Sequence, residues 1–359
     1  MFGMAGFFRL RFVTLALATI ISAGCTANSI AQESFYDPDK YHHMPDGFRN
    51  LPGSLEREHT PFRFLRFFFK RLAKEYSAPT LPEGHVLPRA ETLRQFAAVN
   101  SPRLTWIGHA TFLISMDGLN ILTDPFFSER ASPFTFAGPK RYVAPALEID
   151  DLPAIDVIVI SHNHYDSFDL PALKKLATRT PETLVLVPLG LGSLVREAGF
   201  TNFHEMDWYD EAKVKDVTFT STPTIHWSRR TLTDTNQTLW TGFMITGPSR
   251  KIWFVGDTGF GPAFERDIAP RVGPADIAIV PIGAFLPRDF MRPMHTTPAE
   301  ALKLARIMGA RVAVAMHWGT VQLGEDTPRQ GMERFLAANE PGVTKKIMRI
   351  GESIDLGAL

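Results

Sequence analysis

The feature that most constrains the fold is a series of short apolar runs with β-strand character from Leu104 onward. Residues of high strand propensity fill these runs, and turn-forming residues separate them. The runs are LTWIG, TFLISM, LNILTD, IDVIVIS, TLVLVP, VTFTST, KIWFVGD, DIAIVP and RVAVAMHW. Helices are expected between some of them, at 169–177, 191–198, 297–308 and 328–338. The pattern predicts an α/β sandwich, with two sheets face to face and helices outside, rather than a doubly wound parallel sheet.

Composition excludes one broad class of partner. The 359 residues are 45% hydrophobic, which is enough for a large buried core. Lys and Arg number 38, as do Asp and Glu, so the chain has no net field that would attract a polyanion. We therefore expect no nucleic-acid partner.

The first residues have the pattern of an export signal. Arg9 and Arg11 precede an apolar stretch that is too short to span a bilayer comfortably. The only cysteine, Cys25, ends the sequence SAGC, which resembles a bacterial lipoprotein box. We expect a signal peptide at 1–25 and a periplasmic or membrane-anchored lipoprotein. Cleavage after Ala31, releasing a soluble exported protein, is the alternative.

The region from 26 to 95 is rich in Pro, His, Arg and Phe and has no clear strand pattern. It predicts an extended arm that lies against a catalytic domain at 96–359. Within the arm, residues 62–75 carry basic side chains at helical spacing on one side and apolar ones on another. This segment predicts an amphipathic helix. It would pack on the body of the protein or contact an anionic membrane surface.

Residues of the metal-binding types follow the apolar runs, where strands end and sites are commonly built. In SHNHYDSFD the spacing i, i+2, i+4 directs three side chains to one side of an extended segment: His162, His164 and Asp166. Three later runs end in the same way, at His226, Asp257 and His317. A single such residue is ordinarily a hydrogen-bonded structural group. Four such events in chain order favour a metal centre.

These motifs carry a resemblance to a known family. The order of SHNHYDSFD, HWSRR, GDTG and HWGT resembles the metallo-β-lactamase fold of metal-dependent hydrolases. Within it the chain is most similar to the N-acylphosphatidylethanolamine-hydrolysing phospholipase D group. The motifs shared with that group are GHATFLISMDGLNILTDPFF, ASPFTFAGPKRY, VPLGL, EMDWYDE, GDTGFGPAF and PIGAF. The resemblance implies a four-layer αββα sandwich and hydrolysis of a phosphodiester in membrane phospholipids.

The resemblance also implies a set of ligands for two metal ions. One metal would be held by three histidines, His162, His164 and His226. The second would take Asp166, the residue at position 167 and His317, with Asp257 bridging both ions. Ser167 stands where the family has a histidine.

A serine hydroxyl is a poor zinc ligand, so Ser167 weakens the second site. Three outcomes remain: two Zn²⁺ ions with a looser second one, a single Zn²⁺, or Mn or Fe in the second site. We favour the first, because water can replace a missing ligand in a catalytic zinc site.

The implied chemistry is attack by metal-bound hydroxide on a phosphoryl group, with Asp166 and Asp257 orienting that hydroxide. His295, in MRPMHTTP, would contact the phosphate or assist the leaving group, or else it is a capping or structural histidine before the helix that follows. The same metal chemistry on a lactone or a soluble phosphodiester is an alternative. A lipid-binding lipoprotein without turnover is another.

Three further residues are candidates for substrate contact or support of the site. His109, in GHAT, would support the metals from outside their ligand shell. Arg229 and Arg230 follow His226 closely and would meet a phosphate, although a solvated basic pair explains them as well.

Overall fold

The computed structural model describes residues 35–57, 80–98 and 102–359. The signal peptide expected at 1–25, with Cys25 and Ala31, and the amphipathic helix expected at 62–75 lie outside these residues. Phe35–Leu359 is one compact unit. Within the described ranges, no helix is both long enough and apolar enough to cross a membrane.

The first sheet of the described chain has seven strands. Its strands are β3 (Arg103–Gly108), β4 (Thr111–Met116), β5 (Leu119–Thr123), β6 (Val157–Val159), β7 (Leu184–Pro188), β8 (Phe203–Met206) and β16 (Ser353–Asp355). Their spatial order is β16, β3, β4, β5, β6, β7, β8. Pairing is antiparallel from β16 to β5 and parallel from β5 to β8.

A second seven-stranded sheet follows in the described chain. Its strands are β9 (Glu211–Val214), β10 (Val217–Pro223), β11 (Thr241–Thr246), β12 (Lys251–Phe254), β13 (Ile277–Pro281), β14 (Val312–Met316) and β15 (Thr344–Lys346). They lie in the order β15, β14, β13, β12, β11, β10, β9. Pairing is antiparallel from β9 to β12 and parallel from β12 to β15.

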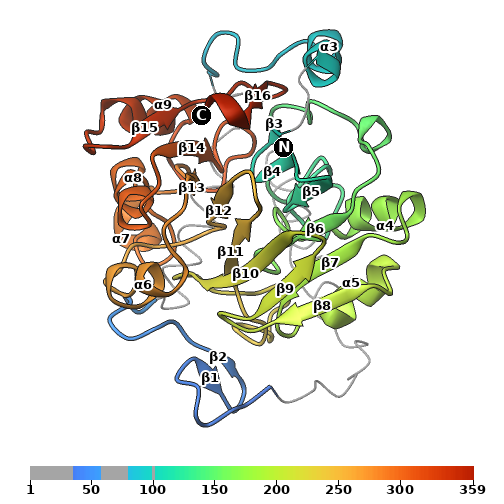
Figure 1. Ribbon diagram of the computed structural model, residues 1–359. Helices are drawn as coiled ribbons and strands as arrows, with labels where there is room; N and C mark the ends of the chain where they lie inside the picture. Colours follow the sequence, from blue (N-terminus) through green and yellow to red (C-terminus); the bar gives the residue numbers. More distant parts are fainter. Residues whose placement is uncertain (1–34, 58–79, 99–101) are drawn as a thin grey trace, which may run out of the picture. The chain divides into compact units, whose positions relative to one another are not determined.

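The two sheets face each other across the main core, and helices cover their outer faces (Figure 1). Strand β4 shows why: Phe112 and Ile114 belong to the core shared with the second sheet, whereas Leu113 belongs to a core with helix residues such as Leu173. Alternate side chains of a strand point to opposite faces, so one strand contributes to both layers. The predicted α/β sandwich is confirmed.

The four predicted helices are present, with ends that differ by one or two residues. They are α4 (Leu170–Arg179), α5 (Gly192–Ala198), α8 (Pro298–Ile307) and α9 (Pro328–Ala337). Asp169 begins α4, because its side chain accepts a hydrogen bond from Ala172 N. Thr297 and Glu300 form a capping box at the start of α8. Shorter helical segments are η1 (Ile149–Asp151), η2 (Phe264–Ile268), α6 (Ala269–Val272), α7 (Arg288–Met291) and η3 (Leu356–Ala358).

The region expected to be an extended arm contains regular structure. Strands β1 (His43–Met44) and β2 (Gly47–Phe48) form a hairpin, and α3 (Arg89–Ala98) is a helix. Two-residue strands are too short to show a period in the sequence. Helix α3 buries only Thr92 among the residues described, so it has no apolar stripe that would have revealed it.

Asp207 holds the hairpin region against the body of the protein. Its Oδ1 lies 2.6 Å from His42 Nε2, and its Oδ2 lies 2.9 Å from His43 Nε2 and 2.7 Å from Lys40 Nζ. Burial alone would raise the pKa of this carboxyl, but the hydrogen bonds from His42 and Lys40 hold it below its usual range. These contacts act together with an apolar one, because Phe48 of the hairpin packs in a buried cluster with Trp208 and Trp240.

Candidate metal centre

Loops at the ends of the strands bring the predicted ligands together. His162, His164 and Asp166 lie between β6 and α4, and His226 follows β10. The remaining predicted ligands, Asp257 and His317, follow β12 and β14. Side chains carried on the ends of both sheets therefore meet at one place, which is where sites in layered α/β folds are usually found.

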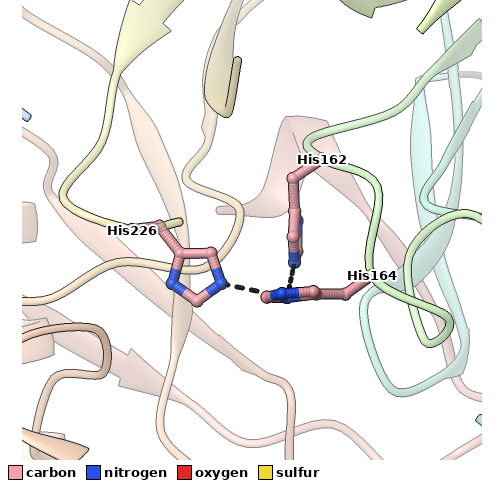
Figure 2. A group of neighbouring side chains, drawn as sticks. All are labelled: His162, His164 and His226. Carbon is pink, nitrogen blue, oxygen red and sulfur yellow. Dashed lines mark hydrogen bonds between the residues drawn. The ribbon is translucent and has the colours of Figure 1, made fainter. Parts of the chain in front are cut away.

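Three histidine nitrogens face one point in the first cluster (Figure 2). His164 Nδ1 lies 2.8 Å from His162 Nε2 and 3.3 Å from His226 Nε2. Ligand atoms of a tetrahedral zinc ion, at metal–nitrogen distances of about 2.0–2.1 Å, are roughly 3.3 Å apart. The spacing of these three nitrogens fits a single ion.

Neighbouring groups orient two of these rings. His226 Nδ1 donates to Met294 O at 2.9 Å, which leaves the Nε2 lone pair for the cluster. His162 Nδ1 lies 2.8 Å from Ser161 Oγ, and that hydroxyl donates to Asp124 Oδ2 at 2.6 Å. Ligand histidines commonly have such a partner on their second nitrogen, because it fixes the tautomer and the ring orientation.

Asp257 connects the first cluster to a second one. Its Oδ2 lies 3.9 Å from His162 Nε2, 3.8 Å from His226 Nε2 and 3.2 Å from His317 Nε2. His317 Nε2 also lies 3.3 Å from Asp166 Oδ2. One carboxylate oxygen thus faces both clusters, as the predicted bridging role requires.

The protonation states suit a cation. Burial would raise the pKa of both Asp166 and Asp257, but their histidine neighbours hold each pKa well below its usual range. Burial lowers the pKa of His162, so that ring is neutral and able to bind a metal. Burial would also lower the pKa of His317, but the nearby Asp257 and Asp166 raise it to about 10. The carboxylates therefore favour a positive charge, which a bound cation would supply instead of a proton.

The donor atoms of this centre are imidazole nitrogens and carboxylate oxygens, a set that suits zinc and also admits manganese or iron. Every residue of the two clusters except His164, which is partly exposed, is buried. Another group of the described chain, His42, His43 and Asp207, has the same residue types. Its carboxylate already accepts from the Lys40 ammonium, so we assign that group to attachment of the hairpin.

The family model for the β-lactamase superfamily domain matches residues 119–318, which include all six predicted ligands. The chain belongs to the metallo-β-lactamase superfamily. N-acyl-phosphatidylethanolamine-hydrolyzing phospholipase D 1 of Caenorhabditis elegans is 35% identical over 295 residues, 77% of this chain and 83% of the relative. An uncharacterized protein of Mycobacterium tuberculosis is 36% identical over 351 residues, 94% of this chain and 89% of the relative.

A solved metallo-β-lactamase fold protein of Bacillus subtilis has the same fold, with a TM-score of 0.51 and 16% identity, over 70% of this chain and 99% of that one. The predicted family and fold are therefore confirmed. Superfamily membership and the buried clusters identify a metal-dependent hydrolase.

Two further histidines, besides the six predicted ligands, lie in these clusters. His295 lies with His226 and Asp257 in one group, and burial lowers its pKa to about 4. Thr297, not His295, caps helix α8, so the capping alternative for His295 is wrong. His109 lies with Asp166 and His317 in the second cluster, and its Nε2 is 2.9 Å from Asp166 Oδ2.

Ser167, Arg229 and Arg230 do not belong to either cluster in the described chain. Ser167 is buried close to Asp124, where burial raises the carboxyl pKa to about 8 and hydrogen bonds from Ser161 oppose that shift. Among the described residues, the Ser167 hydroxyl has no hydrogen-bond partner. Arg230 donates to Asn163 O at 2.6 Å and Phe168 O at 2.9 Å, so it supports the loop that carries the superfamily ligands. Arg229 Nε donates to Thr231 O at 2.7 Å. A phosphate-binding role for the two arginines stays a prediction.

Sequence reasoning missed two residues of the N-terminal region, Asn50 and Arg57. Asn50 Oδ1 accepts from His226 N and its Nδ2 donates to His226 O, both at 3.0 Å. Arg57 lies over the Trp227 ring, with its guanidinium carbon 3.6 Å from the ring centroid. Residues 49–57 also line a cavity of about 390 Å³ together with His226 and Trp227. A region without strand or helix periodicity gave no signal for these contacts.

Proposed function

We propose that the protein is a zinc-dependent phospholipase D that hydrolyses N-acylphosphatidylethanolamine-like membrane phospholipids. It would cleave the phosphodiester on the headgroup side and release phosphatidic acid. The observation that carries the proposal is a pair of buried His/Asp clusters that share Asp257 and lie beside the cavity bordered by His226. The relative from Caenorhabditis elegans, whose name gives this activity, supports the choice of substrate.

In this proposal His162, His164 and His226 hold one zinc, Asp166 and His317 hold the other, and Asp257 contacts both. When bound, such a pair of cations lowers the pKa of water and neutralises charge that develops on a phosphoryl group. The Asp166 and Asp257 carboxylates would orient the attacking oxygen. Neutral His295, which is buried among these groups, would donate a hydrogen bond to the phosphate or the leaving group.

Arg57 lines the adjoining cavity, and we propose that it binds the phosphate of the substrate there. Burial and the charge of Arg229 lower its pKa to about 10, so it remains a cation at neutral pH. Among the residues that the structure describes, its buried Nη1 has no hydrogen-bond partner. A buried guanidinium N–H without an acceptor is costly, and a phosphate would supply both the acceptor and a negative charge.

The test uses zinc-loaded protein and vesicles that contain N-acylated phosphatidylethanolamine. We expect release of N-acylethanolamine and phosphatidic acid, with activity abolished in Asp257→Ala. Arg57→Ala should raise KM more than it lowers kcat, whereas Arg89→Ala, on exposed helix α3, should change neither. Activity only towards lactones or soluble phosphodiesters would overturn the choice of substrate. Zinc-loaded protein inert towards all of these esters would favour a lipid-binding role.

A further inference from the structure

The second cluster lacks the nitrogen that the family places at position 167. Ser167 cannot supply it, because a serine hydroxyl is a poor zinc ligand and this one is buried beside Asp124. Asp166, His317 and Asp257 remain as donors, and no other residue of the loop 161–169 replaces the missing nitrogen. A replacement would have to come from another part of the chain.

His109 brings a nitrogen to this position from the β3–β4 turn, at the same end of the first sheet as the loop after β6. Its Nε2 lies 2.9 Å from Asp166 Oδ2, the oxygen that His317 Nε2 approaches to 3.3 Å. The rings of His109 and His317 have centroids 4.2 Å apart. The donor atoms of His109, Asp166 and His317 all lie within 4.8 Å of one another. With Asp257, the cluster therefore has two nitrogens and two oxygens, the number of ligands that zinc prefers.

The backbone fixes the His109 ring in this position. His109 lies in the tight turn between β3 and β4, with a left-handed φ of 55° that is uncommon for a residue with a side chain. Its carbonyl accepts from His317 N at 3.1 Å and from Trp106 Nε1 at 3.0 Å. Its N–H donates to Thr320 Oγ1 at 2.9 Å. A left-handed backbone that three hydrogen bonds hold in place is typical of a functional position.

The alternative is that His109 only orients Asp166 through a hydrogen bond. The spacing of 2.9 Å, close to the 2.8 Å between the predicted ligands His162 and His164, suits either role. One comparison favours direct ligation. His109 and the predicted ligand His317 each direct Nε2 to Asp166 Oδ2, and each has a buried Nδ1 without a partner in the described chain.

We propose that His109 is a protein ligand of the second metal and takes the place of the histidine that Ser167 replaces. The inference rests on the proposed two-metal function. It also means that the second site is complete in protein ligands, in contrast to the looser site expected from the sequence. His109 lies outside the segment that the superfamily model matches, so its part in the site depends on the fold bringing the β3–β4 turn beside the loop after β14.

The test measures zinc binding and needs no lipid substrate. His109→Asn keeps a residue that tolerates the left-handed backbone and shortens the side chain beyond reach of the metal. We expect zinc content to fall from about two ions per chain to about one. In cobalt-substituted protein, one hyperfine-shifted imidazole N–H resonance should disappear. His85→Asn is the control, because His85 is buried against Trp106 and Trp318 but belongs to neither cluster.

The double variant Ser167→His with His109→Asn should regain the second zinc and the lost resonance. If the asparagine variant does not fold, His109→Gln, which fills similar space, takes its place. The inference fails if the natural protein binds a single zinc, or if loss of His109 leaves the cobalt spectrum unchanged and weakens the second zinc by no more than the 10–100-fold typical of an orienting group. Two bound zinc ions without lipid hydrolysis would refute the proposed substrate alone.

Discussion

Replacing Asn50 with alanine should weaken both the fold and the first metal site. Asn50 makes hydrogen bonds to the backbone N–H and C=O of His226, both at 3.0 Å, and accepts from Trp240 Nε1 at 2.9 Å. The Trp240 indole keeps a second acceptor, Thr224 O at 3.1 Å, so two backbone groups lose their partners. At about 1–3 kcal/mol each, with partial replacement by water from the cavity, we expect a loss of about 2–4 kcal/mol in the free energy of unfolding.

The same change should lower zinc affinity at the first site about 10–100-fold, because His226 would no longer be held in position. Urea unfolding followed by tryptophan fluorescence measures the first effect, and competition with a chelator measures the second. Asn202→Ala is the matched control, since the exposed Asn202 side chain donates one hydrogen bond, to Glu182 O at 3.2 Å, in the described chain. An Asn50→Ala protein with unfolding free energy within about 0.5 kcal/mol of the natural value and unchanged zinc affinity would refute this reasoning.

Two other changes probe the attachment of the hairpin and the second cluster. Because the pKa of Asp207 is lowered in the folded state, its contribution is fully present above the unfolded pKa of about 3.9 and is lost as pH falls further. The difference in free energy of unfolding between the natural protein and Asp207→Asn should therefore be largest near neutrality and shrink as pH falls below about 4. Urea midpoints that differ equally at all pH values would contradict this. A Cβ on Gly283 would lie 2.1 Å from His317 O, so Gly283→Ala should displace His317 and weaken the second zinc while sparing the first. Zinc titration checks it, and equal loss at both sites would count against it.

The six predicted ligands could be found from the sequence because each follows an apolar strand. Strand ends mark where side chains converge, and the order of the motifs carries the family resemblance. Ser167 was singled out as a departure from the family's ligand set, but the residues around it in the fold were not visible from the sequence. The contact between His109 and His317 joins segments more than two hundred positions apart in the chain, through a backbone hydrogen bond that no local pattern encodes.

Three edge strands that sequence reasoning missed share a physical cause. The edge strands β8, β9 and β15 have the sequences FHEM, EAKV and TKK, which are too polar to form an apolar run. Edge strands commonly carry charged side chains, because these discourage pairing with other chains. Asn50 and Arg57 were missed for a related reason. Hydrogen bonds hold Asn50 and a contact with the Trp227 ring holds Arg57, so no apolar face marks either residue in the sequence.

The hydrogen bonds from Asn50 to the backbone of His226 connect the N-terminal region directly to the first cluster. A shortened enzyme that starts at the expected domain boundary, near residue 96, would keep all six predicted ligands and still lose the support of one of them. The N-terminal region is therefore part of the structure that holds the metal centre. Exchanging it between relatives would alter the hydrolase itself, so two relatives with identical ligand sets can differ in metal affinity through a segment that binds no metal.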